Sequence, residues 1–398
     1  MAKPIIIIGG GIAGLALGQA LKKHDIVFRV FERDLDSHSR SQGYRVRISD
    51  QGIEALEASL EPDHFDRLCR GCAKITRTSN IPAGSFDAVS LGEAKPLFPP
   101  GQKAPSVTVS RMLSADRTAL RAILRQGIED FLEYGKDFDH YIENDGKVTA
   151  HFKDGTSVTG SALVGADGAW SKVRHQKLPE YRLADSEARL IYGKTALSPE
   201  FISIFPNQAL DGLVLVRSPQ QTALMETMRF DHSITEAPQD YVYWVLFGRQ
   251  GQHMPDEELF AMNGDETLQL ALRCTSDWHE SYRSLFDRKH AFAGAYRVVT
   301  SRPAEIPVSG KSSRILLIGD AQHPMPPTAA LGATTSLRDV GQLIRCLSDS
   351  GKIDDFAAAA TSYEREMQGY AAIALHESLV GGRAVFGMRP FEELPSIA

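Results

Sequence analysis

The chain has 398 residues, of which 42% are hydrophobic and 24% are charged, and its formal net charge at pH 7 is −6. This composition is typical of a globular protein of two or three domains and excludes a disordered or fibrous chain. The negative net charge gives no attraction for nucleic acid or for an anionic membrane surface.

The N-terminal segment predicts a strand, a glycine-rich turn, a helix and a second strand within about thirty residues, which is a βαβ unit. The turn has the pattern GxGxxG at 9–14, which lets the backbone approach a pyrophosphate and presents the N–H groups of a helix start to its charge. Glu32 ends the second strand where a carboxylate meets a ribose diol. This favours a dinucleotide with a free 2′-hydroxyl, such as FAD or NAD.

Cys69 and Cys72 form a CxxC pair, which matches half of a zinc site or a redox motif. No second CxxC or CxxH lies nearby, so we expect a structural role for the pair. Four cysteines are too few for a disulfide framework in this chain, and a reducing, cytoplasmic environment is expected. The apolar stretch 4–21 is interrupted by glycines, and we expect neither a signal peptide nor a transmembrane segment.

The predicted secondary structure changes twice in the middle of the chain. Segment 115–132 has apolar residues at helical spacing, and two hairpin turns follow at 144–146 and 154–155. Short strands separated by Pro, Gly and Asp fill 189–248 and predict an antiparallel sheet with one face on a core. Helical patterns follow at 256–287 and from residue 336 to the end.

Two later turns place an acidic residue directly after an apolar strand. GADG at 165–168 is followed by Ser171 and two basic residues, an arrangement that equally suits a simple helix cap. GD at 319–320 provides an aspartate that can accept hydrogen bonds from sugar-like hydroxyl groups. A metal site made of Asp320 and His323 has no visible third ligand, so no metal is predicted.

In this order and spacing, the three motifs resemble the single-component (class A) FAD-dependent aromatic hydroxylases over most of the chain. The chain looks most similar to fungal secondary-metabolite tailoring members and to urate-hydroxylase-like members. The expected α/β fold is a Rossmann-like FAD-binding domain (GR2-type) interrupted by a mostly antiparallel β-sheet substrate domain, with a C-terminal helical segment. The predicted boundaries are 1–72, 105–180 and 290–350 for the FAD-binding domain, 73–104 and 181–289 for the substrate domain, and 351–398 for the helical segment.

The resemblance implies cofactor contacts that follow the motifs. The fingerprint would hold the pyrophosphate of FAD, and the end of the second strand would hold its adenosine. The DG turn would contact both FAD and NAD(P)H. The GD turn would bind the ribityl chain, and the start of the next helix would face the flavin ring. The residues assigned in this way are Gly9, Gly11, Ala13, Gly14, Glu32, Arg33, Arg45, Arg47, Arg111, Arg117, Asp167, Asp320, Gly332 and Ala333. Arg45 and Arg47 are alternatives near the flavin, and Arg111 competes with Arg117 for the arginine that opens a helix.

The chain departs from the family pattern near the expected flavin ring. The family often has glycine where this chain has Ala329 or Ala330, and asparagine where it has Thr334. Because alanine disfavours positive φ, we expect a slightly different path for this loop.

The mid-chain strands are the expected substrate platform. Side chains in a strand alternate between two faces, so about half of the candidates should face elsewhere. The candidates are Tyr192, Arg217, Met225, Tyr241, Tyr243, Trp244 and Phe247. Among them, Tyr192 and Arg217 are candidates for a catalytic base or cation acting on a phenol, whereas Met225, Tyr243 and Phe247 are pocket candidates.

The implied function is a monooxygenase with non-covalent FAD that uses NAD(P)H and O2 to hydroxylate a small aromatic or phenolic substrate through a flavin C4a-hydroperoxide. An FAD-dependent epoxidase, a flavin oxidoreductase without oxygen insertion and a non-catalytic flavin-binding protein remain alternatives. We expect a monomer or homodimer without a nucleic-acid partner.

Overall fold

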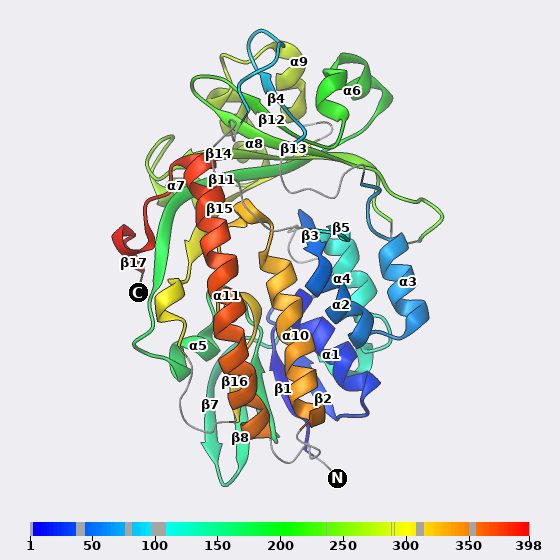
Figure 1. Ribbon diagram of the computed structural model, residues 1–398, viewed down its shortest axis with the longest axis vertical. Helices are drawn as coiled ribbons and strands as arrows, with labels where there is room; N and C mark the ends of the chain where they lie inside the picture. Colours follow the sequence, from blue (N-terminus) through cyan, green and yellow to red (C-terminus); the bar gives the residue numbers. More distant parts are fainter. Residues whose placement is uncertain are drawn as a thin grey trace.

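The computed structural model describes residues 3–36, 44–75, 82–96, 109–235, 237–287, 289, 291–307, 314–349 and 356–397. A parallel sheet forms the lower half of the molecule and an antiparallel sheet crosses the upper half (Figure 1). This arrangement confirms the predicted α/β fold. The helices are α1 (Ile12–Lys23), α2 (Asp50–Ser59), α3 (Pro62–Arg70), α4 (Arg117–Arg125), α5 (Lys172–Lys177), α6 (Pro199–Ile204), α7 (Asp256–Ala261), α8 (Gly264–Cys274), α9 (Glu280–Arg283), α10 (Gly332–Asp349) and α11 (Phe356–Phe386).

The parallel sheet has the strand order β16-β10-β1-β2-β6, and every neighbouring pair runs in the same direction. Four consecutive isoleucines make the central strand apolar on both faces, which suits a strand that is covered on both sides. The strands are β1 (Ile5–Ile8), β2 (Phe28–Phe31), β6 (Leu132–Glu133), β10 (Ala162–Gly165) and β16 (Ile315–Leu317).

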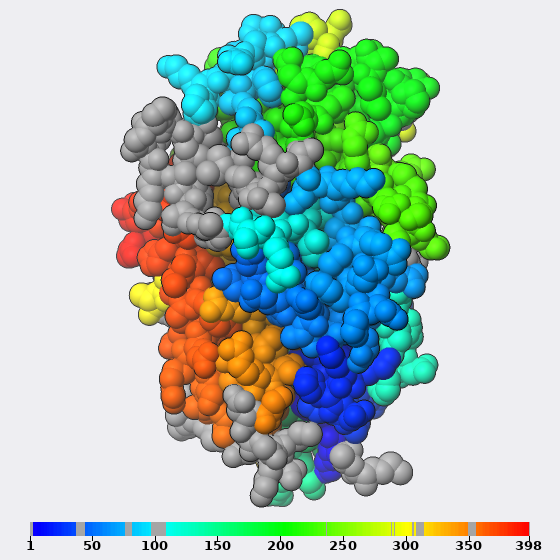
Figure 2. Space-filling view, turned by 45° about the vertical axis from the view of Figure 1, so that its right-hand side comes forward, coloured from blue at the N-terminus to red at the C-terminus, as the bar shows by residue number. Residues whose placement is uncertain are grey.

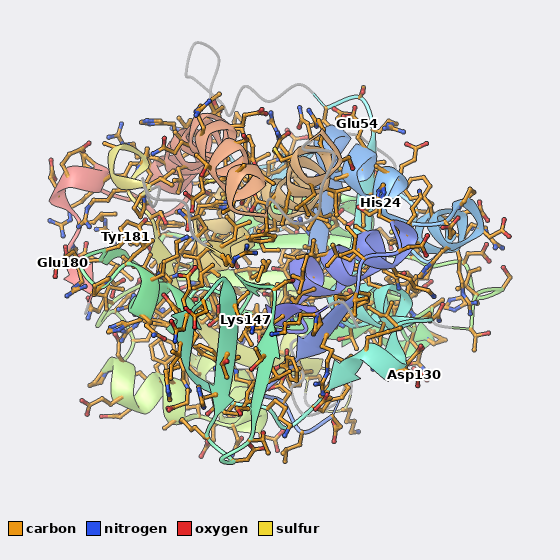
Figure 3. The ribbon with its side chains drawn as sticks, turned by 90° about the horizontal axis from the view of Figure 1, so that it is seen from below. His24, Glu54, Asp130, Lys147, Glu180 and Tyr181 are labelled. Carbon is orange, nitrogen blue, oxygen red and sulfur yellow. The ribbon has the colours of Figure 1, made fainter. Side chains whose placement is uncertain are left out.

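Two layers cover the parallel sheet. Ile5 and Ile7 belong to a core that includes side chains of α1, α10 and α11, whereas Ile6 and Ile8 pack on a three-stranded sheet. That sheet consists of β7 (Phe138–Asn144), β8 (Lys147–Phe152) and β9 (Ser157–Gly160). Seen from below, α10 and α11 lie on one side and the sheet that carries Lys147 on the other (Figure 3).

The antiparallel sheet has the order β15-β11-β14-β13-β12-β4, with β17 also paired to β11. Its edge pair β12–β4 is parallel, and the other pairs are antiparallel. Its distal face packs on a core with α6, α8 and α9, and its other face looks toward the parallel-sheet half. The strands are β4 (Gly84–Asp87), β11 (Leu183–Ala196), β12 (Leu213–Arg217), β13 (Thr222–Met228), β14 (Tyr241–Arg249), β15 (Ala291–Thr300) and β17 (Ser396–Ile397).

A small two-stranded sheet lies between the two halves. It pairs β3 (Arg45–Ser49) with β5 (Met112–Asp116) and lies beneath the antiparallel sheet in Figure 1. Figure 2 shows the N-terminal segments (blue) and α10 (orange) on one face below the mid-chain sheet (green). Within the described ranges, every helix is too short or too polar to span a lipid bilayer.

Two predicted boundaries need correction. Residues 291–300 form β15 and pair with β11, so they belong to the antiparallel sheet and not to the predicted FAD-binding segment 290–350. Their pairing partner lies about a hundred residues upstream, and a single sequence does not show such a pairing. The helix predicted at 115–132 begins only at Arg117, because Asp116 ends β5 and caps the helix by accepting from the N–H groups of Thr118 and Ala119. The remaining domain boundaries stay predictions.

The close packing of β11 against its neighbours gives a test of the antiparallel sheet. A Cβ atom added at Gly193 would overlap the ring of Trp244 and the carbonyl of Phe292. We expect Gly193→Ala to lower the free energy of unfolding by about 3 kcal/mol. Gly369→Ala in α11 is the control, because open space surrounds that position and alanine should stabilise the helix by about 0.5 kcal/mol. Denaturant titration measures both, and equal unfolding midpoints would contradict the packing.

Candidate functional site

The candidate site is a cleft at the carboxyl edge of the parallel sheet. Because β1, β2, β10 and β16 run in the same direction, the turns that follow them meet at one edge, where ligands of open α/β sheets bind. The cleft therefore brings together residues predicted from all three motifs. Its polar and aromatic lining comprises Gly9, Gly11, Phe31, Glu32, Arg33, Asp34, Tyr44, Arg117, Arg121, Lys136, Asp137, Phe138, Asp167, Gly168, Trp170, Lys172, Tyr296 and Asp320.

The fingerprint turn lies in close contact with the backbone that follows the neighbouring strand. Gly9 has φ +111°, and a Cβ atom there would overlap the carbonyl of Ala166 on the neighbouring strand, so only glycine fits. Glu32 accepts the N–H of Gly10 on one carboxylate oxygen (2.7 Å) and the N–H of Asp34 on the other (2.9 Å). The glutamate thus fixes the turn and also faces the cleft, where Arg33 is exposed.

Asp167 caps α5 and lines the cleft at the same time. Its carboxylate accepts from the Ser171 hydroxyl (2.5 Å) and from the Lys172 N–H (2.9 Å), so the helix-cap interpretation describes its contacts. The sequence analysis missed Arg174, whose guanidinium donates to the carbonyls of Ala169 (2.6 Å) and Ala321 (2.8 Å). Arg174 therefore joins the DG turn to the GD turn. Its place in the first turn of α5, three residues after Ser171, was the available signal.

The GD turn depends on a second residue that the sequence analysis missed, Asp339 of α10. Gly319 takes φ +61°, and its N–H donates to Asp339 Oδ2 at 2.6 Å. His323 Nε2 lies 2.8 Å from the same oxygen, and the Tyr370 hydroxyl donates to Oδ1 at 2.7 Å. His323 and Asp339 are both fully buried. The arrangement holds the turn so that Asp320 faces the cleft.

His323 is held by the charge of Asp339. Burial disfavours a charged imidazole, but the charge and hydrogen bond of Asp339 outweigh burial and raise the pKa of His323. The described ranges contain no group of three His, Cys, Asp or Glu side chains that could hold a metal ion. His323 therefore serves the shape of the GD turn.

The expected flavin loop takes an unusual backbone path. Ala330 adopts the left-handed conformation with φ 54° and ψ 32°, which costs an alanine about 1 kcal/mol, and α10 then begins at Gly332. The hydroxyl of Thr334 accepts the N–H of Ser49 at 2.9 Å and so ties α10 to β3. Gly332 and Ala333 lie at this helix start, although neither lines the described cleft.

The structure separates the two competing arginines. Arg117 and Arg121 of α4 line the cleft, and Arg121 donates to the carbonyl of Gly10 at 3.0 Å. Arg111 is exposed, pairs with Glu57 at 3.3 Å and does not line the described cleft, so the structure favours Arg117 as the cofactor-binding choice of the two. Asp50 holds the backbone of residues 110 and 111 at the surface, which turns Arg111 away. Arg121 was missed, although it follows Arg117 by one helical turn.

Arg45 and Arg47 lie at the boundary between the two halves of the molecule and not in the described cleft. Glu226 of β13 contacts both, at 2.7 Å from Arg45 and 2.6 Å from Arg47, and all three side chains are almost fully buried. The Arg45 guanidinium also lies over the ring of Tyr243, 5.2 Å from its centroid. Two arginines of β3 thus hold one carboxylate of the antiparallel sheet.

A second ionic contact crosses the same boundary in the opposite sense. Asp116, which caps α4, pairs with Lys194 of β11 and accepts the hydroxyl of Tyr241 at 3.0 Å. Asp116 lies opposite Arg45 on the small sheet, so the two contacts form one cluster. This interface cluster consists of Arg45, Arg47, Asp116, Lys194 and Glu226, and it carries three cations and two carboxylates.

The substrate candidates divide between the two faces of the antiparallel sheet. Tyr192, Tyr243 and Phe247 point toward the cleft half, where they pack on the main core. Met225 points the opposite way and is fully buried in the distal core, so its prediction as a pocket residue is wrong, and Trp244 lies beside it. The register of β13 on β14, which pairs Met225 with Trp244, puts both on the distal face.

Tyr192 and Arg217 are not brought together. They lie on β11 and β12, with β14 and β13 between them, and Arg217 contacts the carbonyl of Lys95 at 3.4 Å. Tyr192 meets Tyr44 edge to face at 5.3 Å, and Arg117 lies over Tyr44. Burial raises the pKa of Tyr192 to about 12, so near neutral pH its hydroxyl is a hydrogen-bond donor and not a base.

The CxxC pair has the surroundings of structural thiols. Cys72 is buried and donates to the carbonyl of Leu68 at 3.3 Å. Burial raises the pKa of Cys72 and of the half-buried Cys69, which keeps both thiols protonated and unreactive.

The chain is similar to known FAD-binding proteins. A family model described as an FAD binding domain matches residues 303–375, which include the GD turn and α10. The chain is 34% identical to a dual O-methyltransferase/FAD-dependent monooxygenase of Phaeosphaeria nodorum, over 98% of this chain and 47% of that protein. It is 26% identical to an FAD-dependent monooxygenase of Penicillium herquei, over 98% and 93% of the two chains. The chain thus spans about half the length of the first relative.

A solved structure described as an FAD-containing monooxygenase of Photorhabdus luminescens has the same fold. It superposes with a TM-score of 0.75 at 26% identity and covers 96% of this chain and 99% of its own.

The contact between His323 and Asp339 predicts a pH-dependent stability. The pKa of His323 is raised above 6.5 in the folded state, so its contribution is fully present below pH 6.5 and is lost as pH rises through the folded value. The difference in unfolding free energy between wild type and His323→Gln should shrink as pH rises. His140→Gln, at an exposed histidine, is the control. A difference independent of pH between 5 and 9, measured by denaturant titration in steps of roughly one unit, would refute the contact.

The interface cluster predicts a large effect for one neutralised carboxylate. Glu226→Gln leaves Arg45 and Arg47 buried beside a neutral amide, and we expect the free energy of unfolding to fall by about 3 kcal/mol. Arg111→Ala, which removes an exposed pair, should change it by less than about 1 kcal/mol. Chemical denaturation compares the two. Equal small losses would mean that the buried pairs contribute no more than the surface pair.

Proposed function

We propose that this chain, which is similar to FAD-dependent monooxygenases over 98% of its length, binds FAD non-covalently in the cleft and uses NAD(P)H and O2 to hydroxylate a small aromatic or phenolic substrate. The observation that carries the proposal is the convergence of the fingerprint, DG and GD turns on one cleft. Relatives from Penicillium herquei and Talaromyces islandicus are also named FAD-dependent monooxygenases, and a role in secondary metabolism is part of the proposal.

The cleft has the chemistry that a dinucleotide requires. The fingerprint offers a tight glycine turn, in which Gly9 lies directly against the backbone of Ala166, together with the N-terminus of α1 for a pyrophosphate. Glu32 and Arg33 would hold the adenosine, and Asp320 would accept hydrogen bonds from the ribityl hydroxyls. Arg117 and Arg121 add positive charge beside the fingerprint. When bound, FAD would supply the redox chemistry and the activation of oxygen.

The protein's own contribution would be to orient the substrate and to exclude water. The cleft-facing side of the antiparallel sheet presents Tyr192, Tyr243 and Phe247 toward the half that would hold the flavin. Flat aromatic side chains suit a flat ring, and the neutral hydroxyl of Tyr192 can donate a hydrogen bond to a substrate oxygen.

The proposal also includes the domain organisation of the chain. We retain the FAD-binding unit of 1–72, 105–180 and the part of 290–350 that follows β15, with the antiparallel sheet as the substrate unit. A cytoplasmic monomer or homodimer is the proposed form.

Two measurements test the proposal in one preparation. The purified protein should be yellow, and anaerobic NAD(P)H should bleach its flavin much faster with a phenol that is a substrate. In air with labelled O2, the product should carry one labelled oxygen atom. Bleaching without label would indicate an oxidoreductase that inserts no oxygen, and label in an epoxide would indicate an epoxidase.

A variant ties this activity to the cleft. Asp320→Ala should weaken FAD binding at least tenfold, because the loss of one charged hydrogen-bonding partner costs about 1.5–3 kcal/mol. Asp211→Ala, at an exposed carboxylate beside β12, should bind FAD as wild type does. Flavin retention after gel filtration measures both. A colourless wild-type protein that FAD does not reconstitute would overturn the proposed function.

A further inference from the structure

Trp170 stands apart from the other tryptophans of the chain. The sequence contains three, and Trp244 and Trp278 are buried with exposures of 0% and 3%. Trp170 is 52% exposed and lines the cleft. An indole is among the side chains that gain most from leaving water, and one kept exposed on the wall of a cleft indicates a surface that a ligand covers.

The backbone around Trp170 is held firmly. On one side, Arg174 donates to the carbonyl of Ala169 at 2.6 Å. On the other, the Ser171 hydroxyl donates to Asp167 at 2.5 Å and accepts the N–H of Arg174 at 2.9 Å. The exposed ring is therefore presented by a fixed turn and not by a loose loop. A fixed ring loses little conformational entropy when a ligand stacks on it.

The surroundings of Trp170 indicate what kind of ligand it would meet. Lys172 follows it by two residues and lies in the same cleft, as do Lys136 and Arg33. Lys172 pairs with Asp137 at 2.6 Å and Lys136 with Asp154 at 2.7 Å, and Arg33 is exposed. The cleft is lined by carboxylates as well as by cations, and an aromatic face on such a wall matches a nucleotide, whose base stacks while its ribose hydroxyls and phosphates meet both kinds of charge.

We propose that Trp170 is a stacking surface for a planar heteroaromatic ring of a dinucleotide bound in the cleft. The proposal depends on the proposed function, because that function places dinucleotides there. Two ligands carry such rings: FAD has adenine and isoalloxazine, and NAD(P)H has adenine and nicotinamide. Stacking on the indole face is the chemistry they share, and the experiment separates them.

Fluorescence quenching by acrylamide reads Trp170 directly, because acrylamide reaches exposed indoles and the other two tryptophans are buried. The apoprotein, the FAD-loaded protein and the FAD-loaded protein with NAD(P)H are compared under anaerobic conditions. The ligand that stacks on Trp170 should shield it from acrylamide. Trp170→Phe should remove the quenchable component in all three states, which assigns the signal.

Affinity gives a second readout that is independent of turnover. Base–aromatic stacking weakens by roughly 5- to 100-fold when the aromatic ring is replaced by alanine. Trp170→Ala should therefore lower the affinity for the ligand that shields Trp170 by this factor, and Trp170→Phe, which keeps a ring, should lower it by less. Ile204→Ala, at an apolar side chain of α6 that is 55% exposed, is the matched control and should bind as wild type does.

Each outcome decides the proposal. Shielding by FAD alone, or shielding that appears only with NAD(P)H, supports stacking and names the ligand. Bound FAD and NAD(P)H that leave Trp170 fully quenchable, with wild-type affinity in Trp170→Ala, overturn the stacking role and leave the proposed function standing. Failure of the wild-type protein to bind either dinucleotide overturns both.

Discussion

A single buried carboxylate, Asp339, sets the geometry on which the cleft depends. Its carboxylate accepts hydrogen bonds from the turn that carries Asp320, from His323 and from Tyr370 of α11. The loss of any of these partners would leave a buried charge with fewer hydrogen bonds. Asp339 belongs to α10, whose N-terminus lies at the expected flavin loop. The end of β16, the loop and the two C-terminal helices therefore form one unit, and the shape of the GD turn follows from the packing of α10 against α11.

The interface cluster fixes the position of the two halves of the molecule relative to each other, as Asp339 fixes the conformation of one turn. Each half contributes both anions and cations to these ion pairs. The antiparallel sheet contributes Glu226, which pairs with two arginines, and Lys194, which pairs with Asp116. Buried ion pairs contribute little net stability compared with apolar packing, but they tolerate few alternative alignments. The cluster therefore fixes how the antiparallel sheet lies over the cleft. Arg117 follows Asp116 directly, so the position of the sheet also sets the position of a cleft arginine.

The sequence predicted what local chemistry decides. The β1 run, the glycine turn and the hairpin at 144–146 could be identified because each conformation is favoured by the residues that adopt it, as Asp145 and Gly146 show with φ 48° and 69°. Contacts between distant segments could not be predicted. Glu226 looks like any polar residue of an alternating strand, and its partner Arg47 lies 179 positions away. Met225 was misplaced for the same reason, because its face is set by the register with β14. The roles of the cofactor and substrate residues remain predictions.

The interleaving of the two sheets has a consequence for how the chain is made. β1 and the fingerprint helix are synthesised before β10, which pairs with β1, and before β16, which pairs with β10, and most of the antiparallel sheet is synthesised between β10 and β16. The turn that carries Asp320 and the helix that carries Asp339 follow β16. Nascent chains of this protein should therefore expose an incomplete parallel sheet until β16 has been made, and a dinucleotide could engage all three turns only after that point.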